Sequence, residues 1–503
     1  MNKQIIRNIC FNLINFVINM IVGIILTPYL IKHMGIVAYG MVPLAMFITS
    51  YIGVLTQSLT ASVNRCLINA LHNGNNLEVN LIFNTALILM IVLIVVIGAI
   101  LIWPIVNIGY LISVPEILLN ETTTLFLSIL VAFFISLISS VFSVPLYAKN
   151  RIDLMQSANI IKNLTKLLSI LSFFYFGNYR LSIVGYSIVI SEIISLMMYI
   201  YMSRRETPDI QIRFDFFDIS IVRKISGLGG WLIVDQIGVI FLSKLDLLLV
   251  NKIFGSSYSG KYAVITQFSD LFRTMASLIG SVLGPVMMIL YTQGEHSKMA
   301  DLTKSFMKFM SLTMAIPIIV LCVFSEEIIE MWVGPSFNDI TYLVWFIVFP
   351  LIINIGTMPL FSINIAMNKV KIPSLSNIIF GVIGLLIALY LVYYLHLGME
   401  GIAVGFILAT TLKNSLFTPL YAAYILQLPK LTFITVHIRT LLFTLTFTIL
   451  SYYAKEHIEA KGLHLLLFLL LLCCLGFIFT LVFYTPTEIK NIVRTARKLG
   501  HEN

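Results

Sequence analysis

The sequence predicts an all-α membrane protein that crosses the bilayer about fourteen times. Of its 503 residues, 59% are hydrophobic and only 11% are charged, whereas about a quarter of the residues of a soluble protein are charged. Apolar runs of roughly 20 residues, long enough to span a bilayer as a helix, recur along the whole chain. The runs are continuously apolar and do not alternate at every second residue, which disfavours a transmembrane barrel.

The individual spans are read from these apolar runs and from the polar residues between them. The first run, from about Ile5 to Ile31, is too long for a signal-peptide core and lacks a small-residue cleavage pattern, so we expect a retained helix. The fourteen spans begin near Ile5, Val37, Leu81, Thr122, Leu154, Leu181, Gly227, Ser259, Phe306, Tyr342, Ile372, Gly401, Phe433 and Leu463.

The basic residues set the expected orientation. An even number of spans puts both termini on one side, and the connections on that side hold 21 lysines and arginines against 6 on the other. The positive-inside rule therefore predicts a multi-pass protein with both termini in the cytoplasm. The net charge of +9 follows from this topology, so we expect no nucleic-acid partner.

Two short internal matches predict a repeat. Residues 148–151 align with residues 366–369 at an offset of 218 residues, and Gly35 aligns with Gly255 at an offset of 220. Two six-span copies that enter the membrane in the same direction should be related by an axis along the membrane normal. The predicted organisation is an N-lobe (1–203), a charged cytoplasmic linker (204–225), a C-lobe (226–428), two additional transmembrane helices (429–487) and a basic cytoplasmic tail (488–503).

Polar side chains recur on single faces of several predicted spans. Spacings of three and four residues place the asparagines of the first span on one side of the helix. Hydrogen bonding between helices would account for any single stripe. Stripes in both halves favour a wet central cavity. The residues expected to line it are Asn12, Asn15, Asn19, Asn159, Asn354 and Asn364.

Charged residues at membrane depth are costly and therefore pair with each other or line water. Lys162, Lys166 and Lys413 have no obvious partner nearby in the sequence, which makes them candidates for binding an anionic substrate group. Arg273 is a fourth candidate, although Asp270 three residues before it would make a simple ion pair. The carboxylates expected to couple transport to an ion are Asp235 and Asp246, which would share a face of the seventh span, with Asp270 and Glu192.

The sequence contains no pattern that indicates catalysis. The stretch GSSYSGK, residues 255–261, fits G-x-x-x-x-G-K, but Tyr262 stands where a phosphate-binding loop needs Ser or Thr. No zinc-binding, nucleophile-elbow or clustered Cys/His pattern occurs, so we expect neither a metal site nor an enzyme.

A set of motif residues carries a resemblance to a known family. These residues are Pro28, Leu30, Gly35, Tyr39, Gly40, Arg65, Asn150, Arg151, Asp246, Gly255, Tyr262, Asn368 and Lys369. With this pattern the chain resembles the polysaccharide or O-antigen flippases of the multidrug/oligosaccharidyl-lipid/polysaccharide (MOP) exporter superfamily. The resemblance covers nearly the whole chain.

The resemblance implies a two-lobed transporter in the bacterial inner membrane. Such a protein moves undecaprenyl-diphosphate-linked oligosaccharide units by alternating access, coupled to H⁺ or Na⁺ and without another cofactor. It would contact membrane lipid, and a glycan polymerase and chain-length proteins are possible partners.

Three other functions stay open at this point. A multidrug or toxin extruder of the same superfamily would favour an acidic, aromatic cavity. Fourteen spans also occur in flippases of lipid-linked peptidoglycan or teichoic-acid precursors. A membrane glycan polymerase would be expected to have a large outer loop with catalytic residues, and the outer connections here are short.

Overall fold

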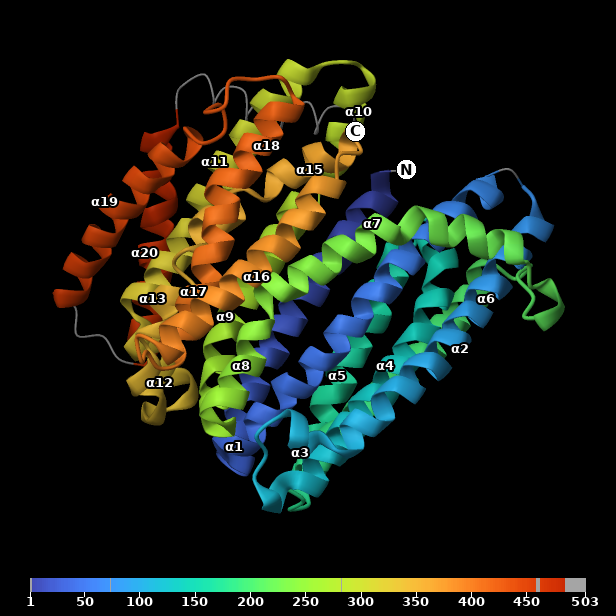
Figure 1. Ribbon diagram of the computed structural model, residues 1–503, viewed down its shortest axis with the longest axis horizontal. Coiled ribbons are helices and arrows are strands. Elements are labelled where there is room, and N and C mark those ends of the chain that lie inside the picture. Colours follow the sequence, from blue (N-terminus) through green and yellow to red (C-terminus); the bar gives the residue numbers. More distant parts are fainter. Residues whose placement is uncertain (1, 73, 282, 458–461, 485–503) are drawn as a thin grey trace. The chain divides into compact units, whose positions relative to one another are not determined.

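All regular structure in the described part of the chain is helical. The computed structural model describes residues 2–72, 74–281, 283–457 and 462–484, and no strand occurs among them (Figure 1). Continuous helices are expected here because a bilayer offers no water to backbone N–H and C=O groups, which must pair within the segment.

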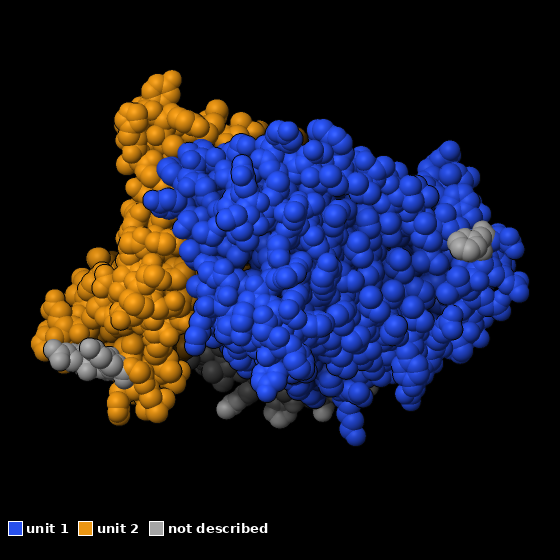
Figure 2. Space-filling view, turned by 90° about the horizontal axis from the view of Figure 1, so that it is seen from below, with its two compact units in different colours: residues 1–240, 247–260 blue, residues 241–246, 261–503 orange. Residues whose placement is uncertain are grey.

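The chain divides into two compact units (Figure 2). Unit 1 holds Met1–Ile240 and Leu247–Gly260, and unit 2 holds Phe241–Asp246 and Lys261–Asn503. The chain therefore leaves unit 1 near the end of α7, returns to it within α8 and leaves it again within α9. The lobe boundaries expected from the sequence remain a prediction, and the expected tail, 488–503, lies outside the described residues.

The first half of the element order runs as far as α8. Its elements are α1 (Asn2–His72), α2 (Asn76–Val106), α3 (Ile108–Leu111), η1 (Glu116–Leu118), α4 (Leu119–Ala148), α5 (Ile152–Tyr175), α6 (Leu181–Glu206), η2 (Phe214–Phe216), α7 (Ile219–Ser243) and α8 (Leu245–Phe254).

The second half runs from α9 to η5 and includes one π-helical turn, η4. Its elements are α9 (Ser256–Gly280), α10 (Leu283–Thr292), α11 (His296–Val323), α12 (Ser325–Val333), η3 (Pro335–Ile340), α13 (Leu343–Ile347), α14 (Leu351–Gly356), α15 (Met358–Ala366), α16 (Lys371–Tyr393), α17 (Met399–Leu412), η4 (Lys413–Phe417), α18 (Thr418–Ile425), α19 (Val436–Glu456), α20 (Leu463–Thr480) and η5 (Leu481–Phe483).

Ten helical stretches in the described residues are long and apolar enough to cross a membrane. The number is below fourteen partly because the first two predicted spans lie within the single helix α1. In addition, α5 carries Asp153, Lys162 and Lys166, which lower its hydropathy, and α7 and α19 are not among the ten. The count of fourteen therefore stays a prediction.

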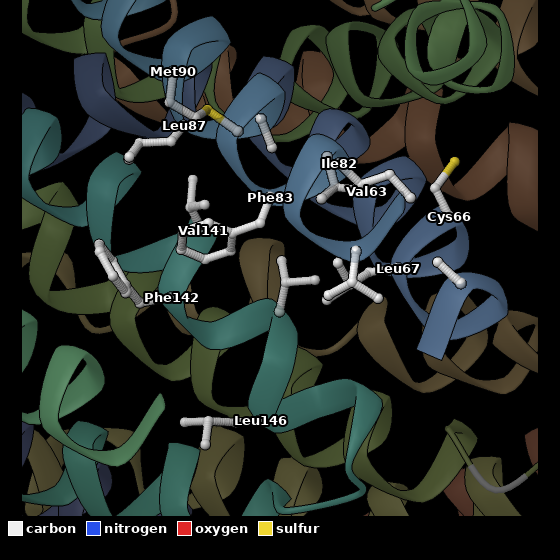
Figure 3. Packing of buried hydrophobic residues seen from close by; sticks show 14 of the residues in the cluster. Val63, Cys66, Leu67, Ile82, Phe83, Leu87, Met90, Val141, Phe142 and Leu146 are labelled. Atoms are coloured by element: carbon white, nitrogen blue, oxygen red, sulfur yellow. The ribbon is translucent and has the colours of Figure 1, made fainter. Parts of the chain in front are cut away.

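Unit 1 is held together by a continuous apolar core between its long helices. Helices α1, α2, α4, α5 and α6 pack side by side. Figure 3 shows Leu67 of α1, Phe83 of α2 and Phe142 of α4 pointing into one cluster. The rings of Phe83 and Phe142 meet edge to face with centroids 5.5 Å apart, an arrangement that contributes about 0.5–1.5 kcal/mol beyond area burial.

Unit 2 has its own core, which is rich in methionine. Met287 of α10, Met299 and Met307 of α11 and Leu360 of α15 are fully buried together. Methionine has flexible rotamers that fill irregular gaps between helices. Each unit therefore has an internal reason to remain compact.

The residues that mark the predicted repeat adopt matching backbone conformations. Gly35, where the helical backbone of α1 is interrupted, has φ 81°, and Gly255 between α8 and α9 has φ 93°. Asn150 before α5 has φ 56° and Asn368 before α16 has φ 54°. Only glycine, and less often asparagine, enters this left-handed region readily. Both sequence matches thus correspond to chain turns of the same kind.

Residues 255–261, which partly match the pattern of a phosphate-binding loop, form a site of close helix packing. A Cβ atom added to Gly260 of α9 would lie 2.5 Å from the backbone oxygen of Ile36, and one added to Gly40 would lie 2.8 Å from that of Ser256. The glycines allow α1 and the start of α9 to approach closely. The backbone of Ile36 occupies the space beside Gly260, so the motif serves packing.

Candidate functional site

An amide row joins three helices of unit 1. Asn15 of α1 donates to Gln156 Oε1 of α5 over 2.8 Å, and Asn159 of α5 donates to the same oxygen over 3.4 Å. The Tyr199 hydroxyl of α6 donates to Asn159 Oδ1 over 3.4 Å. Hydrogen bonds between helices thus occupy part of the asparagine face expected to line a cavity.

The outer members of this face remain accessible. Asn12 is half-buried and Asn19 is exposed, and Asn15 and Asn159 are half-buried. The spacing of Asn12 and Asn19 on α1 places both on the same side of the helix as Asn15. The face can therefore both hold helices together and offer amide groups to a polar ligand.

Lys162, for which the sequence offered no partner nearby, has one on the next helix. Its Nζ lies 3.2 Å from Glu192 Oε1, so the pair links the middle of α5 to the middle of α6. The partner was hidden in the sequence because it lies on the next helix, 30 residues away. The pair is partly accessible, with 29% of the lysine side chain and 14% of the glutamate side chain exposed.

Lys166 adds a second positive charge one helical turn along α5. It lies within electrostatic reach of both Lys162 and Glu192. The two ammonium groups and the one carboxylate together carry a net positive charge. A di-anionic ligand would complement it better than a cation or a neutral molecule would.

A buried ionic network lies at the start of α5. It was not predicted from the sequence. Asp153 has a side chain with 0% exposure, and its carboxylate lies 3.0 Å from Arg7 Nε and 3.2 Å from Arg151 Nε. Gln4 also donates to it over 2.7 Å. Arg151 pairs in turn with Glu206 at the end of α6.

Asn8 completes this network and is not part of the accessible amide face. Its side chain donates to the backbone oxygen of Asn150 over 3.1 Å and accepts from the backbone N–H of Asp153 over 3.0 Å. The pair Asn150-Arg151 is the part of the sequence that could have indicated this network, because asparagine is one of the few residues that readily adopt a left-handed turn. The network ties α1, α5 and α6 together.

In unit 2 the predicted lysine is deeply buried. Lys413 is 2% exposed, and its Nζ lies 5.1 Å from the ring centre of Phe361 and 3.5 Å from Asn414 Oδ1. Both Lys413 and Asn414 belong to the π-helical turn η4. Such turns are rare and recur at functional sites.

Two further amides of unit 2 behave differently from each other. Asn354 of α14 accepts from Asn414 over 3.1 Å and donates to Thr411 over 3.2 Å. Asn364 of α15 is also buried, yet neither its oxygen nor its nitrogen has a hydrogen-bond partner among the described residues. The structure therefore brings Asn354, but not Asn364, into contact with the η4 turn.

Two charged contacts lie where the chain passes into unit 2. The Tyr262 hydroxyl donates to Asp246 Oδ2 over 2.8 Å, and Lys244 Nζ lies 2.7 Å from both carboxylate oxygens of Asp270. Among the ion pairs of the described residues, Asp270 is thus joined to Lys244 and not to Arg273. Arg273 donates to Ser269 Oγ over 3.3 Å.

The shared face expected for Asp235 and Asp246 remains a prediction. Helix α7 ends at Ser243 and α8 begins at Leu245, so the two carboxylates stand on different helices. Both are half-buried. The prediction of a shared face assumed one continuous helix, because no proline in the sequence indicates a break here.

Known structures share this arrangement of helices. An inward-facing multidrug resistance MATE family transporter of the MOP superfamily superposes with a TM-score of 0.66 at 13% identity, over 85% of this chain and 94% of that one. The lipid II flippase MurJ in its inward closed conformation superposes with a TM-score of 0.62 at 14% identity, over 95% and 99% of the two chains. The fold is that of a multi-pass membrane transporter of the MOP type.

The sequence places the chain more narrowly. It belongs to the family described as polysaccharide biosynthesis protein, which it matches over residues 34–342. It is 27% identical to the uncharacterized membrane protein EpsK of Bacillus subtilis, over 85% of both chains. It is 23% identical to a proposed O-antigen transporter of Shigella flexneri, over 67% of this chain and 78% of that one. The chain is thus a multi-pass membrane protein of the polysaccharide biosynthesis family, with the fold seen in the MATE transporter and in MurJ.

Proposed function

We propose that this protein flips undecaprenyl-diphosphate-linked oligosaccharide units from the cytoplasmic to the outer leaflet of a bacterial inner membrane. The cargo is a repeat unit of O-antigen, capsule or exopolysaccharide. The family membership and the proposed O-antigen transporter among its relatives support this class of cargo. The bias of basic residues supports cytoplasmic termini.

The observation that carries the proposal is the pair of lysines one turn apart on α5, of which Lys162 is paired with Glu192. Lys162 and Lys166 bind the diphosphate, and Glu192 holds Lys162 in place when no substrate is bound. Charge-assisted hydrogen bonds to phosphate oxygens are about twice as strong as neutral ones. The accessible amides of Asn12, Asn19 and Asn159 then hydrogen-bond sugar hydroxyls.

The buried cations of unit 2 contribute less directly. Lys413 and Arg273 raise the positive potential around the substrate, and Asn354 and Asn364 add amide groups. We assign coupling to H⁺ or Na⁺ to the carboxylates Asp235, Asp246, Asp270 and Glu192, whose partners would change during an alternating-access cycle. A glycan polymerase and chain-length proteins would act on the flipped product.

Replacing both lysines with alanine tests the proposal. The double variant Lys162→Ala/Lys166→Ala should lower surface glycan more than tenfold, because losing two charge-assisted bonds weakens binding by about 3 kcal/mol or more. Lys162→Arg, which keeps the charge, should retain export. Surface glycan is measured by immunoblot in a strain whose own flippase is deleted, with protein level measured in parallel.

An exposed lysine provides the matched control. Lys304 is paired with Asp301 on the surface of α11, so Lys304→Ala should export normally. Normal surface glycan in the double variant would contradict the proposal. Loss of export in the control as well would show that any lysine substitution impairs the protein.

A further inference from the structure

The segment between α6 and α7 follows α2 closely although it has almost no regular structure. We define residues 209–218 as the linker strap. Asn80 of α2 donates to the backbone oxygen of Asp209 over 3.2 Å and accepts from the N–H of Gln211 over 2.7 Å. Asn84, one turn later, donates to the oxygen of Gln211 over 2.8 Å and accepts from the N–H of Arg213 over 2.9 Å.

Thr85 extends this row of contacts to the end of the strap. Its hydroxyl accepts from the N–H of Asp218 over 3.1 Å and lies 3.5 Å from the oxygen of Phe216. Three polar side chains of α2 therefore make six hydrogen bonds to the main chain of the strap.

The chemistry of these side chains explains why the contact is firm. An asparagine amide offers one acceptor and a donor group, so it can pair with a peptide unit as a neighbouring strand would. Asn80, Asn84 and Thr85 are all buried, and a buried polar group left unpaired costs roughly 1–3 kcal/mol. By contrast, the side chains of Gln211 and Arg213 are exposed. Helix α2 therefore recognises the backbone of the strap.

Apolar contacts fix the strap at both ends. Ile221, just after it, is buried in the core cluster of unit 1, and Ile210 near its start packs against the same cluster. Asp218 also caps the start of α7, because its Oδ1 accepts from the Ser220 N–H over 2.7 Å. Hydrogen bonds from Ser220 hold the pKa of the Asp218 carboxyl below its usual range, so the carboxylate that starts α7 stays ionised.

We propose that the linker strap fastens the start of α7 to unit 1, so that the chain first leaves unit 1 near the end of α7 and not in the charged linker. A charged segment of this length between two repeats would by composition be a flexible tether. Here it is bound along its length, and α7 stays in unit 1 through Ile240. The chain first changes unit at Phe241–Asp246. This inference does not depend on which lipid-linked glycan is carried.

Hydrogen exchange tests the bound state of the strap. The amide hydrogens of Gln211, Arg213 and Asp218 should exchange on the order of tenfold more slowly than that of Ile212, because each is held by a side chain of α2. Peptide-resolved mass spectrometry of the purified full-length protein in nanodiscs measures this.

Substitutions in α2 make the exchange experiment specific. Asn84→Ala should speed exchange at Arg213 about tenfold, while Asn76→Ala, about two turns earlier on α2 and exposed, should leave it unchanged. Uniformly fast exchange across the strap in the unmodified protein, or unchanged exchange in Asn84→Ala, would overturn the proposal.

Cross-linking tests whether the strap stays fastened to α2. In a variant without the five native cysteines, Asn84→Cys with Ile212→Cys and Thr85→Cys with Phe217→Cys each place two thiols across the strap and α2. Oxidation should form the disulfides, and flipping in proteoliposomes should continue within twofold of the reduced rate because the strap does not need to move. A tenfold fall that reducing agent reverses would overturn the proposal, as would failure of both pairs to form disulfides.

Discussion

Lys162 of unit 1 and Lys413 of unit 2 have very different surroundings. Lys162 of unit 1 has a side chain that is 29% exposed and faces a carboxylate on the next helix. Lys413 of unit 2 is 2% exposed and lies beside an aromatic ring and an amide. Lys162 thus has a partner that it could exchange for a ligand, whereas Lys413 is buried against the ring of Phe361 on another helix.

The chain turns before α5 and α16 show the same contrast. Asn150 and Asn368 have the same left-handed backbone, yet the turn in unit 1 is followed by the fully buried Asp153 and the turn in unit 2 by the exposed Lys371. A repeated backbone corner therefore does not dictate repeated chemistry. Unit 1 carries the stronger ionic anchoring at this corner and the more accessible charge within its helices.

The largest effect on stability is expected at Asp153. Asp153→Ala removes the centre of a buried network and leaves Arg7 and Arg151 facing each other, which should cost about 3–5 kcal/mol. Thermal unfolding in detergent, followed by intrinsic fluorescence, should show a clearly lowered Tm. Lys371→Ala at the corresponding turn of unit 2 should leave Tm nearly unchanged. Equal shifts in the two variants would remove the contrast between the corners.

An intermediate effect is expected at the crossing into unit 2. Asp246→Asn keeps the size of the side chain and can still accept from Tyr262, but it cannot carry a charge that changes on proton or sodium binding. The initial flipping rate under an imposed ion gradient should fall about tenfold, as expected when ~1.4 kcal/mol of driving interaction is lost. Tyr262→Phe should slow flipping less. A rate in Asp246→Asn equal to that of the parent would exclude this carboxylate from coupling.

The smallest effect is expected at the enclosed lysine. Lys413→Met fills a similar volume with an apolar chain, so Tm should stay the same or rise, because replacing a buried charge by a hydrophobic residue is often neutral or stabilising. Surface glycan should fall only about threefold, corresponding to less than ~1 kcal/mol of long-range attraction. A loss as large as that of the double variant in unit 1 would show that both units bind the diphosphate equally.

The sequence was sufficient for the class of protein and for several key positions. Apolar run length predicted a helical membrane protein, and the matched residues predicted a repeat whose glycines and asparagines do have the same left-handed backbone. The asparagine row of α1 was identified from its spacing, and Lys162 was identified from its charge at membrane depth. These features depend on local chain properties, which a single sequence records.

The pairings could not be predicted because they depend on how helices are rotated against each other. Lys162 meets Glu192 only because α5 and α6 pack with those faces together. Asp153 is buried by residues near the start of α1, about 150 positions away. The break at Lys244 lies in a stretch without proline or glycine, so no local signal separates Asp235 from Asp246.

The central claim is that the accessible cation pair of unit 1 binds the diphosphate of a lipid-linked glycan. The most direct test is the affinity of the purified protein for a short-chain polyprenyl-diphosphate oligosaccharide, compared with the same glycan on a neutral polyprenol, by native mass spectrometry. The parent protein should prefer the diphosphate at least tenfold, and Lys162→Ala/Lys166→Ala should lose that preference while binding the neutral glycolipid as before. An undiminished preference in the double variant would contradict the account.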